Sequence, residues 1–329
     1  MYQTADLNVA VEHALRAPSV HNTQPWHWRI RPDAVELHAD WNRHLVATDP
    51  DRRDLVMSCG AALHHLQVAL AAGGLAVHVH RVPDPEDPGH LATVEVRPGT
   101  GDPADAAQFP AIDRRRTDRR RMSHRPVPPG DVQELAEHAR RVGTLLLPVT
   151  TAAMRMRFTA TLVQAGHRQE STPGYVAELQ RWTRRYAGGH DGIPATNVAP
   201  SPVGLVGTSP LRRFPREELS QPPQPSGHGP ADDAAELLVI ATPHDGPLDW
   251  LRAGEATSAV LLVATSMGLA TTPLSQALEV ETTRHEIQQE VLHVPEHPQI
   301  IIRVGWPAAG AAELPVTQRR ELRLVLLPS

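Results

Sequence analysis

Apolar residues recur every three or four positions along several stretches of the chain, which is the spacing of one face of a helix. Leu7, Val11 and Leu15 predict a first helix near the N-terminus. Two long apolar helices are predicted over about 53–72 and 251–267, and both end at glycine, where a left-handed backbone costs little. Shorter helices are predicted over about 132–141, 152–166 and 175–186.

Short apolar and β-branched runs between these helices predict strands. The strands cover about 26–30, 35–38, 75–82, 92–96, 145–149, 237–241 and 299–304. The two long helices have similar glycine-containing ends, and this pattern indicates an internal duplication. We therefore expect an α+β fold in which mixed central sheets are flanked by helices.

Segment 188–233 differs from the rest of the chain, because it is rich in proline and glycine and has no sustained periodicity. A loop of this length inside a compact domain is usually either functional or disordered. The residues alone leave both interpretations open.

The charge balance narrows the choice of partners. The 329 residues include 32 basic and 37 acidic side chains, for a net charge of −5, and none of the basic residues is lysine. Catalysis through a lysine Schiff base is therefore excluded, and nucleic acid or an anionic membrane is not expected as a partner. No apolar run approaches the roughly 18 residues that span a bilayer, and no signal peptide is visible. We expect a cytoplasmic protein.

Cysteine and histidine give little support for a metal centre. Cys59 is the only cysteine, which excludes an intrachain disulfide, and its apolar helical surroundings predict a buried, inert thiol. His78 and His80 would share one face of a strand, and His64 stands next to His65. No third ligand follows at a recognisable spacing, so no metal site is expected.

The most informative motif is the polar loop Ala17-Pro18-Ser19-Val20-His21-Asn22-Thr23-Gln24-Pro25-Trp26, directly after the first predicted helix. The side-chain amides of Asn22 and Gln24 can each donate and accept, so they could bind the edge of a planar heterocycle. Pro25 favours an extended backbone at the preceding residue. The alternative is a purely structural loop that Trp26 anchors.

A second motif is the densest positive charge in the chain. The run 114–121 holds six arginines in eight residues, and these repel one another unless an anion or carboxylates lie among them. Guanidinium groups match phosphate oxygens geometrically, so a nucleotide phosphate is one candidate partner. A solvated basic loop paired with surface carboxylates is the other.

The first motif resembles the flavin-binding loop of the nitroreductase-like FMN flavoproteins, whose pattern is roughly A-P-S-x-x-N-x-Q-P-W. The arginine run resembles the R-R-S/T-x-R segment with which that family holds the FMN phosphate. Within the family the chain is similar to the Acg-like branch, in which one chain carries two nitroreductase-like halves. The resemblance implies a nitroreductase-like fold with halves 1–108 and 109–329, fused as a pseudo-dimer, and a lid over the flavin at about 188–233.

The resemblance also implies which residues bind FMN. Near the C-terminus, Arg319 and Arg320 match a basic pair of the family, although surface arginines would look the same. Segment 272–276 resembles the part whose backbone faces the flavin ring, although a plain turn would also fit. The implied FMN-binding residues are Pro18, Ser19, His21, Asn22, Gln24, Arg115, Arg116, Thr117, Arg119, Pro273, Leu274, Ser275, Arg319 and Arg320.

The two halves carry complementary motifs. The first half has the polar loop but no arginine segment at its start, and the second has the arginine segment but no polar loop. In a nitroreductase homodimer, the flavin lies at the interface, where one subunit gives the arginine segment and C-terminal basic residues and the other subunit gives the polar loop. We therefore expect one composite FMN site per chain, in a monomer.

If FMN binds, the cofactor carries the redox chemistry and no catalytic side chain is needed. The expected reaction is hydride transfer from NAD(P)H through flavin N5 to a small electron-poor acceptor, a nitroaromatic or a quinone. The alternative is an FMN-binding or FMN-sequestering protein whose closed lid prevents turnover.

Overall fold

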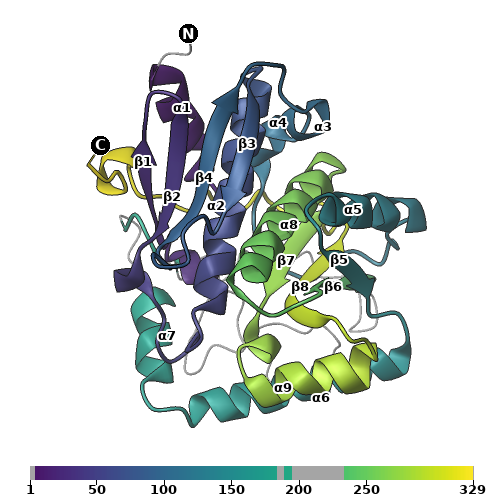
Figure 1. Cartoon of the computed structure of the whole chain (residues 1–329). Helices are drawn as coiled ribbons and strands as arrows, with labels where there is room; N and C mark the ends of the chain where they lie inside the picture. The colour runs from purple at the N-terminus through teal and green to yellow at the C-terminus, as the bar shows by residue number, and fades with distance from the viewer. Residues whose placement is uncertain (1–3, 184–188, 195–232, 329) are drawn as a thin grey trace.

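The computed structural model describes residues 4–183, 189–194 and 233–328, and Figure 1 shows an α+β molecule. Most of the segment expected to form a lid, 188–233, lies outside the described residues, and so does the end of the helix predicted over 175–186. Otherwise each predicted helix and strand lies within a few residues of a described one.

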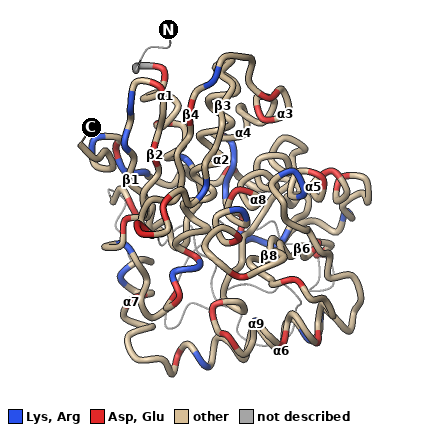
Figure 2. The backbone as a smooth tube through the Cα atoms, viewed as in Figure 1, with Lys and Arg blue, Asp and Glu red and all other residues tan. Residues whose placement is uncertain are grey.

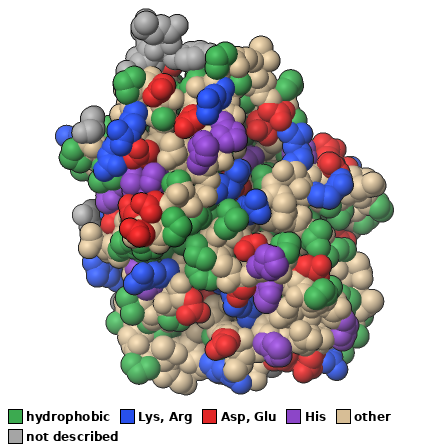
Figure 3. Space-filling view, in the orientation of Figure 1, with side chains coloured by type: hydrophobic (Ala, Val, Ile, Leu, Met, Phe, Trp, Pro, Cys, Tyr) green, Lys and Arg blue, Asp and Glu red, His purple; other side chains and the backbone are tan. Residues whose placement is uncertain are grey.

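The first sheet has the strand order β1-β2-β4-β3. Its strands are β1 (Trp26–Ile30), β2 (Ala34–Ala39), β3 (Ala76–Arg81) and β4 (His90–Arg97). Helices α1 (Thr4–Ala14) and α2 (Arg53–Ala72) pack on one face, where Leu7, Trp28 and Leu63 belong to the same buried cluster. Figure 3 shows histidine and charged side chains gathered on the other face. Burial of one face explains why apolar and polar residues alternate along β1.

The second sheet has the corresponding order β5-β6-β8-β7 and is covered on both faces. Its strands are β5 (Leu145–Pro148), β6 (Glu236–Thr242), β7 (Ala270–Leu274) and β8 (His297–Gly305). Helices α5 (Pro129–Arg141) and α8 (Pro247–Ser266) cover one face. Helix α6 (Ala152–Glu170) and the π-helical stretch Ile287–Leu292 after α9 (Glu281–Glu286) cover the other. The remaining helices are α3 (Pro103–Ala106), α4 (Phe109–Arg114) and α7 (Tyr175–Thr183).

Two expectations about the sheets need correction. Every ladder between the described strands is antiparallel, so the expected mixed sheets are wrong. Within the described part of the chain, parallel pairing occurs only in isolated bridges, such as the one between Thr117 and Thr271. The segment around Pro273 was not predicted as a strand, yet it lies in β7, which pairs with β8 alone. Proline is tolerated there because an edge strand leaves some N–H groups unpaired.

Helices α2 and α8 pack against each other in the middle of the molecule (Figure 1). They cross at Gly60 and Gly254, where a Cβ atom would lie 2.0 Å from the carbonyl oxygens of Leu251 and Met57, respectively. Only glycine permits this approach. Helix α2 is long and apolar enough to cross a membrane by composition, but 89% of that stretch is buried inside the protein. It therefore has the burial of a core helix.

Cys59 lies on α2, and its thiol donates to the carbonyl oxygen of Pro25 at 3.2 Å. Burial raises the pKa of this thiol, and the nearby Asp40 carboxylate raises it further. The predicted burial of Cys59 is confirmed. Because the raised pKa disfavours the thiolate, which is the reactive form, the side chain is expected to be inert.

Candidate functional site

A cavity brings together segments that are far apart in the sequence. One wall is the loop between α1 and β1, a second follows α4, and a third comes from the C-terminal stretch after β8. The sequence-predicted residues that line it are Pro18, Ser19, His21, Asn22, Arg115, Arg116, Thr117, Arg119 and Arg319. The polar loop and the arginine run, nearly one hundred positions apart, therefore share one site.

Positive charge predominates in the lining of the cavity, although Arg16 pairs with Asp113, which is not a lining residue, at 3.5 Å. The lining includes Arg16, Arg115, Arg116, Arg119 and Arg319, and none of the described lining residues is acidic. Elsewhere in the described chain, basic and acidic positions are interspersed (Figure 2). A buried charge without a counter-charge is costly, so this arrangement favours a bound anion.

Arg115 shows the need for an anion most clearly, because its side chain is buried and its Nε and Nη1 atoms have no hydrogen-bond acceptor among the described residues. Burial, together with the neighbouring Arg116, lowers the pKa of Arg115 to about 10. The Nε atom of Arg319 also lacks an acceptor, and burial with nearby arginines, Arg115 first, lowers its pKa to about 9. Both groups remain charged at neutral pH, and their unused donors suit the oxygens of a phosphate.

The polar loop holds an unusual backbone. His21, Asn22 and Gln24 have φ values of 46°, 55° and 50°, in the left-handed region that non-glycine residues rarely adopt. Two hydrogen bonds hold the loop. The backbone N–H of Gln24 donates to the Ser19 hydroxyl at 2.9 Å, and the backbone N–H of Val20 donates to Ser58 Oγ on α2 at 3.0 Å. Such strain persists only where the surroundings enforce it, and it is typical of ligand sites.

The two amides expected to face a ligand are already engaged. Asn22 Nδ2 donates to the carbonyl oxygens of Gly192 at 2.9 Å and Gln318 at 3.2 Å. Gln24 Nε2 donates to His190 O at 2.8 Å, and its Oε1 accepts from Arg320 N at 2.7 Å. Gln24 does not line the cavity. Asn22 keeps one unused group, the buried Oδ1 atom, which can accept from a ligand.

Arg319 and Arg320, the expected basic pair, have different roles. Arg319 lines the cavity, whereas Arg320 does not. Arg320 Nη1 donates to Gln24 O at 3.1 Å and to Asp40 at 3.3 Å, and Nη2 donates to Leu324 O at 2.8 Å. Arg320 therefore holds the polar loop against the C-terminal stretch. Adjacent residues point to opposite sides of an extended chain, and sequence could not say which of the two reaches the cavity.

The structure does not place Pro273, Leu274 and Ser275 among the residues that line the cavity. Leu274 is buried in the core, and the Ser275 hydroxyl donates to Glu279 at 2.6 Å. Their strand still adjoins the site, because Asp118 N donates to Thr271 O at 2.9 Å. Lining residues that sequence reasoning missed are Arg16, Ile112, Ile193, Leu314, Pro315, Val316 and Thr317.

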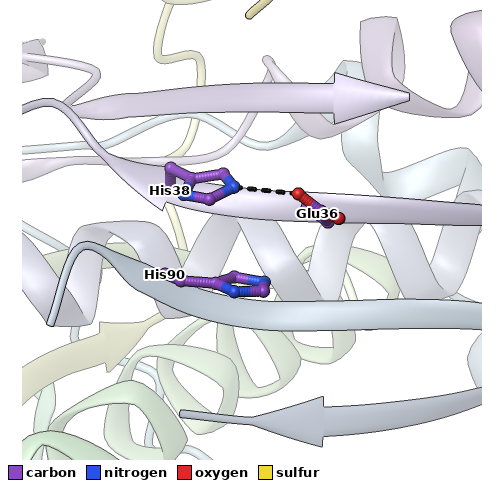
Figure 4. Close-up of side chains that lie close together, drawn as sticks. All are labelled: Glu36, His38 and His90. Atoms are coloured by element: carbon purple, nitrogen blue, oxygen red, sulfur yellow. Dashed lines mark hydrogen bonds and ion pairs between the residues drawn. The ribbon is translucent and has the colours of Figure 1, made fainter. Parts of the chain in front are cut away.

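The structure also gathers a cluster of metal-ligand types that no motif indicated. Glu36 and His38 on β2 lie beside His90 on β4 (Figure 4). Burial opposes the charge on Glu36, but hydrogen bonds from Arg31, His38 and Arg29 outweigh it and lower its pKa to about 2. The histidine rings stack at 4.6 Å with 18° between their planes, so their lone pairs do not converge. Glu36 is already neutralised by arginine, and we interpret the cluster as a structural ion-pair network.

The adjacent histidines on α2 also have a structural explanation. The Nδ1 atoms of His64 and His65 each lie 2.8 Å from Ser258 Oγ on α8. Burial lowers the pKa of His64 to about 4 and that of His65 well below its ordinary value. These neutral rings join the two long helices through one hydroxyl.

Comparison with known proteins gives the relatives of the chain. The model of the Nitroreductase family matches residues 207–306. The chain is 47% identical to "Putative NAD(P)H nitroreductase Rv3131" of Mycobacterium tuberculosis over 95% of this chain and 88% of that one. It is 33% identical to "Putative NAD(P)H nitroreductase acg" of the same organism over 98% and 95%.

Among solved structures, the FMN-dependent nitroreductase NfnB from Mycobacterium smegmatis, in complex with NADPH, is 18% identical with a TM-score of 0.43. The likeness covers 69% of this chain and 100% of that one. The two Mycobacterium tuberculosis relatives are similar along nearly the whole chain. The chain belongs to the nitroreductase family, in the branch that includes the Acg protein.

Proposed function

We propose that the protein is an FMN-dependent NAD(P)H oxidoreductase with one composite flavin site per chain. The observation that carries the proposal is the cavity in which Arg115 and Arg319 have unused donors and no carboxylate among the described lining residues. The names of the relatives and the motifs of the family support FMN as the anion and NAD(P)H as the electron donor.

The residues present fit an FMN phosphate. Arg115 and Arg319 would hold its oxygens with charge-assisted hydrogen bonds, and Arg116 and Arg119 would add charge. The free Oδ1 of Asn22 would accept from a donor on the same ligand. When bound, FMN supplies hydride transfer, and the protein supplies position and electrostatics. The acceptor would be a small nitroaromatic or quinone.

The internal duplication supports a single site. Each proposed half, 1–108 and 109–329, contains a four-stranded sheet with the same strand order and one long central helix. Gly60 and Gly74 lie as far apart in the first half as Gly254 and Gly268 do in the second, and the glycines that end the two long helices both have positive φ. The halves therefore resemble two subunits of a homodimer that were joined.

The position in the second half that corresponds to the polar loop lacks the features of an anion site. It is the turn 141–145 between α5 and β5. There Arg141 pairs with Asp102 at 2.5 Å and lies 4.0 Å from Asp105. Carboxylates therefore already neutralise the arginine, which supports one FMN per chain. Location in the cytoplasm stays a prediction.

A second candidate function is FMN storage without turnover. The observation that favours it is that Gly192 and His190 occupy the amide donors of the polar loop. A protein that closes over its flavin would exclude nicotinamide, whereas an enzyme must admit it.

Rapid mixing of the flavin-loaded protein with NADPH or NADH, without oxygen, separates the two functions. We expect the visible flavin band to bleach within seconds and to return when a quinone is added. A band that stays unchanged for minutes at saturating NADPH and NADH would contradict the oxidoreductase and support storage.

A further inference from the structure

Residues 189–194, here called the strap, bind the polar loop through the backbone. His190 O accepts from Gln24 Nε2 at 2.8 Å, and Gly192 O accepts from Asn22 Nδ2 at 2.9 Å. Between these two acceptors, Gly192 N donates to Asn22 O at 3.1 Å. The strap is more than 160 residues away from the loop in sequence, so this contact belongs to the tertiary fold.

The order of groups on the strap has a chemical parallel. Facing the loop, the strap presents a carbonyl oxygen, an N–H and a carbonyl oxygen, which is an acceptor, a donor and an acceptor. The pyrimidine edge of a flavin ring presents the same series: carbonyl, imide N–H, carbonyl. A flavin edge placed against the loop would therefore require the same donors of Asn22 and Gln24 that the strap occupies.

We propose that the strap is an internal competitor of the flavin ring, so that it must leave Asn22 and Gln24 before a flavin can use those amides. The proposal rests on the FMN function above and adds a regulatory contact to it. The competition concerns only the ring end of the site. At the other end, Arg115 keeps its unused donors while the strap is bound.

The strap is also held by its side chains. Asp191 pairs with Arg43 at 2.9 Å, and the two side chains are only 16% and 20% exposed. Gly192 has a φ of 76°, so a β-branched residue there would strain the docked conformation. Ile193 N donates to Trp182 O at 2.7 Å, which anchors the strap to α7.

Two strap variants test the competition, Asp191→Ala and Gly192→Val. The matched control is Gly310→Val, which places the same residue at a left-handed glycine in open space, with a φ of 70°. The probes are FMN, riboflavin, which lacks the phosphate, and inorganic phosphate. Flavin affinity is measured on the flavin-free full-length chain by quenching of flavin fluorescence, and phosphate affinity by calorimetry.

Since a docked strap lowers the binding-competent fraction, both strap variants should bind FMN and riboflavin at least about fivefold more tightly than the wild type. Phosphate affinity should stay unchanged, and Gly310→Val should behave as wild type. Equal or weaker flavin binding by the strap variants would overturn the proposal and leave the proposed function intact. Absence of flavin binding in the wild type and all variants alike would overturn both.

Discussion

FMN affinity should fall roughly 10- to 100-fold when Arg115 is replaced by alanine, because each charge-assisted hydrogen bond contributes about 1.5–3 kcal/mol. Arg115 lines the cavity and is buried, and its Nε and Nη1 atoms have no acceptor among the described residues. The double variant Arg115→Ala with Arg319→Ala should lose FMN during gel filtration. Affinity is measured by titrating the flavin-free protein with FMN.

The matched control is Arg114→Ala, from the same arginine run. Arg114 is exposed and does not line the cavity. The Arg114→Ala protein should therefore bind FMN as tightly as the wild type does. Thermal unfolding distinguishes binding from a structural role: removing a buried, uncompensated charge should leave the flavin-free protein as stable or more stable. Unchanged FMN affinity in the double variant, or an equal loss in Arg114→Ala, would contradict the phosphate assignment.

The second large effect concerns stability. Gly60→Ala should destabilise the protein by at least about 3 kcal/mol. Extra atoms in a packed core destabilise a protein most where the backbone itself has to move. The added Cβ would lie 2.0 Å from Leu251 O, so α2 and α8 would have to separate. Their packing joins the two sheets, and the measurement is the free energy of unfolding in urea.

Gly130→Ala is the control, with the same substitution in a helix. A Cβ at Gly130 meets nothing within 4 Å, and alanine favours α5 by up to about 1 kcal/mol. This variant should be as stable as the wild type or slightly more stable. A Gly60→Ala protein that unfolds at the wild-type urea concentration would show that the helices do not depend on close contact at this point.

Much of the fold could be predicted from local sequence. Periodicity located the long helix α2 at its observed bounds, because apolar side chains surround it on nearly every side. β7 was missed because Pro273 reads as a turn signal, and its edge position is decided only by the assembled sheet. The antiparallel direction of the ladders also depends on topology, which a list of strands does not contain.

The candidate site, like the fold, could be predicted from sequence where it depends on local motifs and not where it depends on tertiary contacts. The two motifs named most of the cavity's polar lining, since each is a contiguous stretch with its own chemistry. The contacts of Gln24 and Arg320 with distant backbone could not be read from spacing. The cluster of Glu36, His38 and His90 depends on the register between β2 and β4, which includes an irregularity at residues 37–38. Tertiary pairing, and not residue type, decides these features.

The most direct test of the composite site is the ratio of FMN to polypeptide in the purified full-length protein saturated with FMN. Flavin released by denaturation gives one quantity, and the chain concentration gives the other. One FMN per chain, in a particle with the mass of a monomer, is the result that two complementary halves predict. Two FMN per chain, or a protein that stays colourless with excess FMN, would contradict it.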